Sequence, residues 1–288
     1  MKRTCTVGVH TIGPGHPLTV IAGPCTLESP ELGLRVGRRV LEVCRELGLG
    51  YIFKASYDKA NRTSAAGRRG PGVERGLDQL AAIRDELGVP VTTDVHTPEQ
   101  CELAAQRVDL LQIPAFLCRQ TDLLLAAGEA ARAHGRAVNI KKGQFLSPVE
   151  MRGPVEKVAG TGCSEILVTD RGTFFGYHRL VTDLIGLGDL IDPPAEWDTD
   201  GMPPVCYDAT HSAQLPGGGG ASSGGRADRA PLLARAAVAA GVHAVFLETH
   251  PDPSIAWSDG ATMIPLDEAP AVLASLAALR SALDSAAV

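Results

Sequence analysis

Two groups of side chains in this 288-residue sequence are of types that bind or transform anionic substrates. The first is a set of cations that follow short apolar runs: Lys54, Lys59, Arg62, Arg119, Lys141 and Arg171. Arginine offers phosphate or carboxylate a planar fork, and lysine offers a point charge. The chain has only six lysines against 21 arginines, so lysine at these positions predicts a specific role in binding a substrate with several negative groups. Ion pairs with Asp58, Asp94 and Asp170 are the alternative role for these cations.

The second group combines a thiol, an imidazole and two carboxylates, in Cys25, His211, Glu248 and Asp259. Side chains of these three kinds together can bind a divalent metal ion. The four positions are far apart in the sequence, so their spacing does not show that they meet. Cys25 alone also fits a buried apolar residue, and His96, His178 and His250 are equally good histidine ligands. The residues by themselves leave both questions open.

Short apolar runs alternate with amphipathic helical patterns along the whole chain. Strands are predicted at 18–22, 51–53, 91–93, 110–113, 137–140, 165–168, 204–207 and 244–247. Helices are predicted near 31–47, 72–87, 98–107, 120–134, 148–159, 178–184, 229–240 and 266–285. Apolar strands that alternate with helices indicate a parallel sheet, and eight such units predict a (β/α)8 TIM barrel. A doubly wound sheet is the alternative, but no glycine-rich phosphate fingerprint follows the first strand.

The segments outside this alternation also carry predictions. Residues 1–16 precede the barrel, and we expect a short N-terminal β-hairpin there that closes the bottom of a single barrel domain over 17–288. Residues 186–204 are predicted to be a loop, and the glycine-rich segment 214–228 is predicted to be mobile and to close over a site. Each predicted strand ends in ionisable or amide side chains, as at Gln112, which is where a barrel of this kind has its active site.

Composition excludes several classes of function. The net charge of −6 disfavours a nucleic-acid partner. No run approaches the ~20 apolar residues of a membrane span, and residues 1–13 lack the apolar core of a signal peptide. The seven cysteines are scattered and include no CxxC pair, which favours a reducing compartment. We therefore expect a cytoplasmic protein that acts on small molecules.

The motifs at the strand ends resemble those of the 3-deoxy-D-manno-octulosonate 8-phosphate synthase family. They are Ile21-Ala-Gly-Pro-Cys25, Phe53-Lys-Ala-Ser56, Asp58-Lys-Ala-Asn-Arg-Thr63, Thr92-Thr-Asp-Val-His96, Gln112-Ile-Pro-Ala-Phe-Leu-Cys-Arg-Gln-Thr-Asp122, Val138-Asn-Ile-Lys-Lys-Gly-Gln-Phe145, Asp170-Arg-Gly172, Tyr207-Asp-Ala-Thr-His-Ser212, Glu248-Thr-His-Pro251 and Ser258-Asp-Gly260. They keep their order over residues 19–280. The run 114–122 is highly specific, because the related heptulosonate phosphate synthases and sialic acid synthases share the barrel but not this run.

The resemblance implies condensation of phosphoenolpyruvate with D-arabinose 5-phosphate and water, which gives 3-deoxy-D-manno-octulosonate 8-phosphate and phosphate. It assigns phosphoenolpyruvate to Lys54, Lys59, Gln112, Ala115, Lys141 and Arg171. It assigns the pentose phosphate to Asn61, Arg62, Thr63 and Asp94, with Arg119 reaching in from a neighbouring subunit of a homotetramer. The catalytic residues that it implies are Cys25, Lys54, Lys59, Asn61, Asp94 and His211.

Cys25 places the chain with the metal-dependent members of this family, since the metal-independent members have asparagine after Ala-Gly-Pro. The resemblance therefore implies a divalent metal ion (Zn, Fe, Mn or similar) on Cys25, His211, Glu248 and Asp259.

The chain departs from the family pattern after Arg62, where residues 63–70 lack the usual aromatic residue near the acceptor. A different aldose phosphate in a specialised sugar pathway is therefore the alternative substrate. Two rival functions also fit the residues: a Schiff-base aldolase that uses Lys54 or Lys141, and a sugar-phosphate sensor without catalysis.

Overall fold

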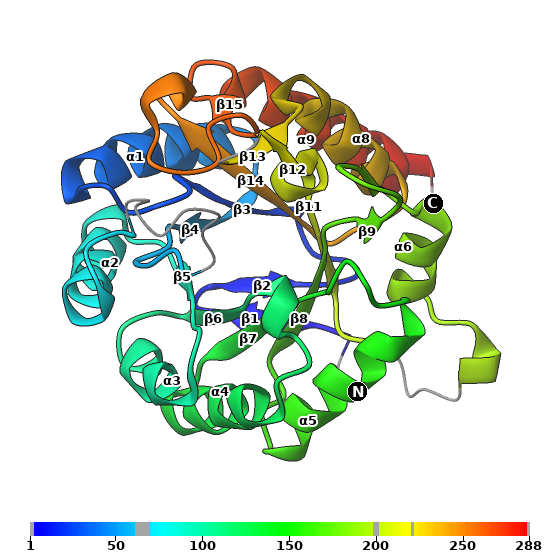
Figure 1. Cartoon of the computed structure of the whole chain (residues 1–288). Coiled ribbons are helices and arrows are strands. Elements are labelled where there is room, and N and C mark those ends of the chain that lie inside the picture. The colour runs from blue at the N-terminus through cyan, green and yellow to red at the C-terminus, as the bar shows by residue number, and fades with distance from the viewer. Residues whose placement is uncertain (1–2, 61–68, 198–201, 220–221, 287–288) are drawn as a thin grey trace.

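A closed ring of eight parallel strands forms the centre of the molecule (Figure 1). The structure, a computed structural model, describes residues 3–60, 69–197, 202–219 and 222–286. The ring consists of β3 (Thr19–Gly23), β4 (Gly50–Lys54), β5 (Val91–Asp94), β6 (Leu110–Ile113), β7 (Ala137–Lys141), β8 (Ile166–Asp170), β11 (Val205–Asp208) and β14 (Ala244–His250). Because β14 pairs in parallel with both β11 and β3, the ring closes. The predicted TIM barrel is confirmed.

Helices surround the ring and cover its outer face (Figure 1). They are α1 (Pro30–Glu46), α2 (Val73–Leu87), α3 (Pro98–Ala105), α4 (Thr121–His134), α5 (Arg152–Gly160), α6 (Leu184–Ile191), α8 (Ala230–Ala239) and α9 (Ala269–Ala286). The start of α1 is fixed by Ser29, whose side chain accepts from the backbone N–H of Leu32, and by Pro30 in the first turn. In the described part of the chain, no helix is both long and apolar enough to cross a membrane.

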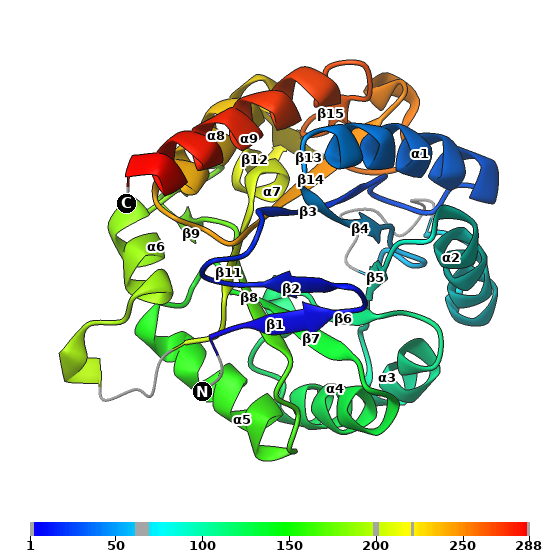
Figure 2. The same cartoon turned by 180° about the vertical axis from the view of Figure 1, so that it is seen from behind.

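The predicted N-terminal hairpin is present and lies across one end of the barrel (Figure 2). It pairs β1 (Cys5–Val7) with β2 (His10–Ile12) in antiparallel register. Val7 and Ile12 are fully buried and form one apolar cluster with Ile52, Leu110 and Phe246 from the barrel strands. The hairpin therefore fills the amino-terminal end of the barrel, and the opposite end remains for a binding site.

The prediction of a helix near residues 178–184 is wrong. An antiparallel hairpin of β9 (Thr173–Phe174) and β10 (Leu180–Val181) occupies this region. The helix begins later, at α6, because the Asp183 side chain accepts from the backbone N–H of Gly186 and so caps it. The loop predicted over 186–204 consequently starts as helix, and a short 3-10 turn follows at Ala195–Trp197.

The glycine-rich segment after β11, which was predicted to be a mobile loop over 214–228, contains regular secondary structure. A short helix, α7 (Ala209–Ser212), leads into β12 (Gln214–Gly219), which pairs antiparallel with β13 (Ser222–Gly225). Backbone hydrogen bonds build this hairpin, so it needs no apolar side chains to form. Whether it closes over a substrate stays a prediction. After β14 the chain passes through a loop to β15 (Ile264–Pro265), which pairs with β14.

Candidate active site

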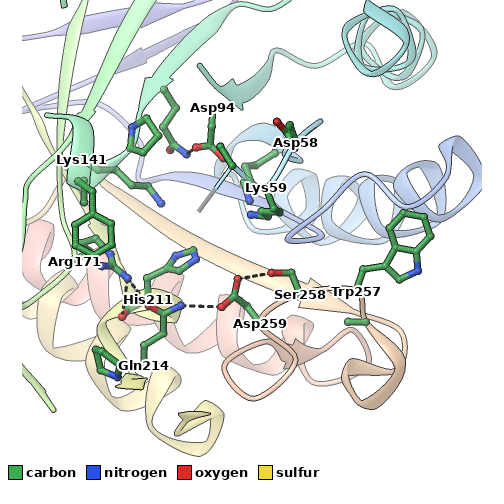
Figure 3. A pocket seen from close by; sticks show the side chains of 18 of the residues that line it. Asp58, Lys59, Asp94, Lys141, Arg171, His211, Gln214, Trp257, Ser258 and Asp259 are labelled. Atoms are coloured by element: carbon green, nitrogen blue, oxygen red, sulfur yellow. Dashed lines mark hydrogen bonds between the residues drawn. The ribbon is translucent and has the colours of Figure 1, made fainter. Parts of the chain in front are cut away.

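A cavity of about 1020 Å³ opens at the carboxyl ends of the barrel strands. Its lining includes nine of the residues singled out from the sequence: Lys54, Lys59, Asp94, Gln112, Ala115, Lys141, Arg171, His211 and Asp259. Figure 3 shows how Lys59, Asp94, Lys141, Arg171, His211 and Asp259 lie around one open space. Cys25 and Glu248 are buried beside this space, at 1% and 0% exposure. Arg119 is exposed and is not among the lining residues. Asn61, Arg62 and Thr63 lie outside the described residues.

The thiol and the two carboxylates predicted to bind metal do meet. Cys25 follows β3, Glu248 lies on β14, and Asp259 lies in the loop between β14 and β15. One potential ligand atom from each lies within 4.8 Å of the others. The Cys25 thiol donates to Asp259 Oδ2 over 3.1 Å, and His211 Nε2 lies 3.6 Å from Glu248 Oε2.

Glu248 Oε2 is a buried oxygen that accepts no hydrogen bond from the described residues. A buried carboxylate oxygen without a partner is uncommon in folded proteins and often marks a missing ion or water. Together with the thiol and the imidazole, this oxygen fits a divalent cation of the zinc or iron type.

The electrostatics of the cluster differ between the thiol and the carboxylates. Burial, and then the Glu248 carboxylate, raise the pKa of the Cys25 thiol well above its ordinary value. Burial alone would raise the pKa of Glu248 too, but the charges of Lys54, His211 and Lys59 together outweigh it and lower that pKa. Without a metal ion, Cys25 is thus a neutral thiol beside ionised carboxylates, and binding an ion must release its proton.

Lys54 occupies the centre of this charge arrangement. Its ammonium donates to Glu248 Oε1 over 2.5 Å and to the Cys25 carbonyl over 3.0 Å. The close approach of β3 to β4 depends on Gly23, because a Cβ atom there would lie 1.9 Å from the Lys54 carbonyl oxygen. Only glycine therefore lets Cys25 and Lys54 lie side by side.

Asp208, at the end of β11, is a strand-end residue to which the sequence reasoning gave no role. Its buried Oδ2 accepts from Lys141 Nζ over 2.7 Å and contacts His211 Nδ1 over 2.7 Å. Burial opposes ionisation, but the charges of His211 and Lys141 hold the pKa of Asp208 well below its usual range. With Nδ1 engaged, His211 presents Nε2 toward Glu248, the arrangement expected for a metal-binding histidine. The available signal was the position of Asp208, three residues before His211 at a strand end.

Asp94 organises the wall of the cavity that lies across from Arg171 (Figure 3). It accepts hydrogen bonds from Ser56 Oγ and from the Gln112 amide. Burial disfavours its charge, but the surrounding lysines, Lys54 first, lower the pKa of Asp94 well below its usual range. Lys59 Nζ donates to Ser56 Oγ over 3.0 Å. Ser56 is a second residue that the sequence reasoning did not single out.

Among the described residues, the predicted cations form none of the alternative ion pairs with Asp58, Asp94 or Asp170. Asp58 pairs with Arg69 at 2.5 Å and Asp170 with Lys142 at 3.3 Å, and neither cation belongs to the predicted substrate set. Within that set, Arg171 donates to the Gln214 side chain over 2.6 Å. Arg171 therefore remains able to bind an anion that enters the cavity.

The closed barrel and the cation-lined cavity at its carboxyl ends define this protein as a TIM-barrel enzyme. Residues 5–285 match the model of the DAHP synthetase I family, and the chain belongs to that family. It is 55% identical over 264 residues to the 2-dehydro-3-deoxyphosphooctonate aldolase of Rhodopseudomonas palustris, covering 92% of this chain and 88% of the relative.

Two further relatives of the same name show similar agreement. The enzyme of Syntrophotalea carbinolica is 50% identical over 279 residues, which cover 97% of this chain and 96% of the relative. The enzyme of Granulibacter bethesdensis is 53% identical over 266 residues, which cover 92% of this chain and 90% of the relative. The family resemblance found in the sequence motifs is confirmed.

Proposed function

We propose that this protein condenses phosphoenolpyruvate with D-arabinose 5-phosphate and water to form 3-deoxy-D-manno-octulosonate 8-phosphate and phosphate. The observation that carries the proposal is the meeting of Lys54, Lys59, Lys141 and Arg171 around one cavity, in a chain that is half identical to enzymes named as 2-dehydro-3-deoxyphosphooctonate aldolases. Phosphoenolpyruvate carries a phosphate and a carboxylate, and these cations match that charge.

In this reaction C3 of phosphoenolpyruvate bonds to the aldehyde carbon of the sugar, and a water oxygen bonds to C2. The C2–O bond breaks, phosphate leaves, and the aldehyde oxygen gains a proton. Lys141 is well placed to hold the donor, because Asp208 and the face of the Phe246 ring, 3.8 Å away, fix its ammonium. Fixed cations on both sides of the cavity would hold the two substrates in a reactive pose.

Cys25, His211, Glu248 and Asp259 would hold a divalent metal ion such as Zn, Fe or Mn, in keeping with the thiol among the donors and with the unsatisfied Glu248 oxygen. Such an ion supplies Lewis-acid polarisation or lowers the pKa of a nearby water. The protein's own contribution is to exclude bulk water and to orient the substrates through Asp94 and the cations.

A product screen tests the proposal directly. Phosphoenolpyruvate is offered with a panel of aldose phosphates, with and without divalent metal, and we expect an eight-carbon product from arabinose 5-phosphate only with metal. Turnover of another aldose phosphate alone would favour the specialised pathway. Borohydride trapping of a lysine adduct would instead favour the Schiff-base route through Lys54 or Lys141.

Arg171→Ala should mainly impair use of phosphoenolpyruvate. The variant removes a charge-assisted contact worth about 1.5–3 kcal/mol, so we expect kcat/KM for this substrate to fall by about 10- to 150-fold. Arg171→Lys should recover part of the loss, since it keeps the charge but not the fork. The measurement is steady-state kinetics with each substrate varied. A change confined to the aldose phosphate KM would contradict the assignment.

We also propose a homotetramer in which Arg119 serves a neighbouring subunit. Arg119 is exposed, and an aromatic patch lies in the same region: Phe116, Phe145, Phe174, Phe175 and Tyr177 are between 44% and 95% exposed. Phe174 lies next to residues 144–145, because its N–H donates to the Gln144 carbonyl over 2.9 Å. Exposed apolar patches of this kind commonly mark protein interfaces.

Scattering in solution should show a tetramer, and Phe175→Glu should weaken its association. Arg119→Ala should instead lower activity toward the sugar phosphate while leaving the tetramer intact. A fully active monomer would contradict the proposal.

We further propose a cytoplasmic location for this protein. Cys25, Cys44, Cys101, Cys118, Cys163 and Cys206 are free thiols buried in the structure, as expected in a reducing compartment.

A further inference from the structure

Asp259 is held in an unfavourable backbone conformation. It has a φ of 53°, in the left-handed region that residues other than glycine rarely adopt. The adjacent Gly260 packs so tightly that a Cβ atom there would lie 2.2 Å from the Pro253 carbonyl oxygen. A loop with this geometry keeps its shape only where its surroundings fix it, so the contacts that fix it determine where the Asp259 carboxylate lies.

One such contact comes from Glu28, in the loop that also carries Cys25. Glu28 Oε1 accepts from the backbone N–H of Trp257 over 2.9 Å, two residues before Asp259. The same oxygen lies 3.6 Å from Nε2 of the buried His250, whose Nδ1 accepts from the Asp252 N–H over 3.0 Å. Glu28 thus contacts the β14–β15 loop near its middle and, through His250, at its start.

The Glu28 loop is itself anchored to the barrel. The Ser56 N–H donates to the Cys25 carbonyl over 3.2 Å, and the Leu27 N–H donates to the Ser56 carbonyl over 2.9 Å. Lys54 Nζ donates to the same Cys25 carbonyl over 3.0 Å. Cys25 and Glu28 therefore extend from one rigid base toward the β14–β15 loop, three residues apart.

We infer that Glu28 is a positioning residue that holds the β14–β15 loop so that the Asp259 carboxylate lies beside the Cys25 sulfur. The inference rests on the proposed metal centre, for which Glu28 pre-organises one of the four ligands, Asp259. It binds no ion itself. Its effect reaches the centre through the Trp257 amide and His250, as partners outside the ligand set orient ligands in other metal sites.

The test is titration of the chelator-treated full-length protein with Cd²⁺, followed by the ultraviolet charge-transfer absorption of the cadmium–thiolate bond. Glu28→Ala should weaken Cd²⁺ binding by about 10- to 100-fold while the absorption at saturation stays that of wild type, because Cys25 is still present. Glu28→Gln should recover most of the affinity, since its amide oxygen can still accept from the Trp257 N–H. Glu46→Ala, an exposed glutamate in α1, is the charge-matched control and should bind as wild type.

A double-mutant cycle with Asp259→Ala shows whether Glu28 acts through that ligand. We expect the Glu28→Ala substitution to cause no further loss once Asp259 has been replaced. Equal losses in both backgrounds, or a Glu28→Ala affinity equal to wild type, would overturn the inference.

Amide hydrogen exchange of residues 252–260 in the metal-free protein separates this inference from the metal proposal. Faster exchange in Glu28→Ala than in Glu46→Ala supports the positioning role, and equal exchange overturns it. If wild type shows no thiolate absorption with Cd²⁺, the proposed metal centre fails, and the exchange comparison alone decides the role of Glu28.

Discussion

Cys25→Ala should abolish tight metal binding and lower turnover by at least about 100-fold, since changes in residues that only orient ligands already cost 10- to 100-fold. The barrel should stay folded, because Cys25 lies beyond the end of β3 and its side chain is small. Wild-type protein should lose activity with a strong chelator and recover with Mn²⁺, Fe²⁺, Co²⁺ or Cd²⁺, whereas Mg²⁺ should restore little because a thiolate ligand is soft. Metal content and turnover are measured side by side.

Cys25→Asn is the second substitution to test, because the metal-independent members of the 3-deoxy-D-manno-octulosonate 8-phosphate synthase family have asparagine at this position. We expect it to retain a little activity that chelators do not remove. Since burial keeps the Cys25 thiol protonated, Cd²⁺ binding should release about one proton more in wild type than in either variant. Full activity in metal-free wild-type protein would rule out the metal proposal.

Asp208→Asn should lower turnover by between about 100- and 10,000-fold, because one carboxylate oxygen fixes both Lys141 and His211. An amide in its place can donate to Nδ1, which favours the wrong imidazole tautomer, and in a catalytic triad this exchange costs about 10⁴-fold. We also expect weaker metal binding and a higher KM for phosphoenolpyruvate. Kinetics and Cd²⁺ titration measure the two effects separately.

Asp109→Asn is the matched control for Asp208→Asn. Asp109 is also a buried aspartate, paired with Arg136 at 2.8 Å, but it precedes β6 at the other end of the barrel. Breaking either buried pair can cost about 3–5 kcal/mol of stability, so both variants should melt earlier. Only Asp208→Asn should lose catalysis at temperatures where both are folded, and equal activity in the two would show that Asp208 has only a structural role.

The barrel could be predicted from the sequence because its strands are almost entirely buried, so that most of them contain a short apolar run between helices. The prediction failed at the sixth unit, where Phe174, Tyr177 and Leu180 belong to a short hairpin. Two-residue strands leave no periodicity to detect. The cap that starts α6 was visible as Asp183 before an apolar run, but the helical pattern was placed too early.

The sequence was enough to predict which strand-end residues form the candidate site. It was not enough to predict which of these side chains contact one another. Cys25 and Asp259 are separated by 234 residues and meet only because β14 pairs with β3. The role of Asp208 could not be assigned from the sequence because it depends on its partner Lys141, two strands away across β8. Pairing between distant positions depends on barrel closure, which no local pattern records.

Lys54 gives the buried Glu248 a counter-charge of the protein's own. Removing the proposed ion would therefore leave Glu248 paired, and the large penalty of an unpaired buried charge would not arise at this carboxylate. On the metal proposal, we therefore expect the ion-free chain to stay folded, unlike small zinc domains that unfold without their ion. The proposed ion would bind the free Oε2 of Glu248 while Lys54 keeps Oε1, so loading after folding would add a second cation to a carboxylate that already has one.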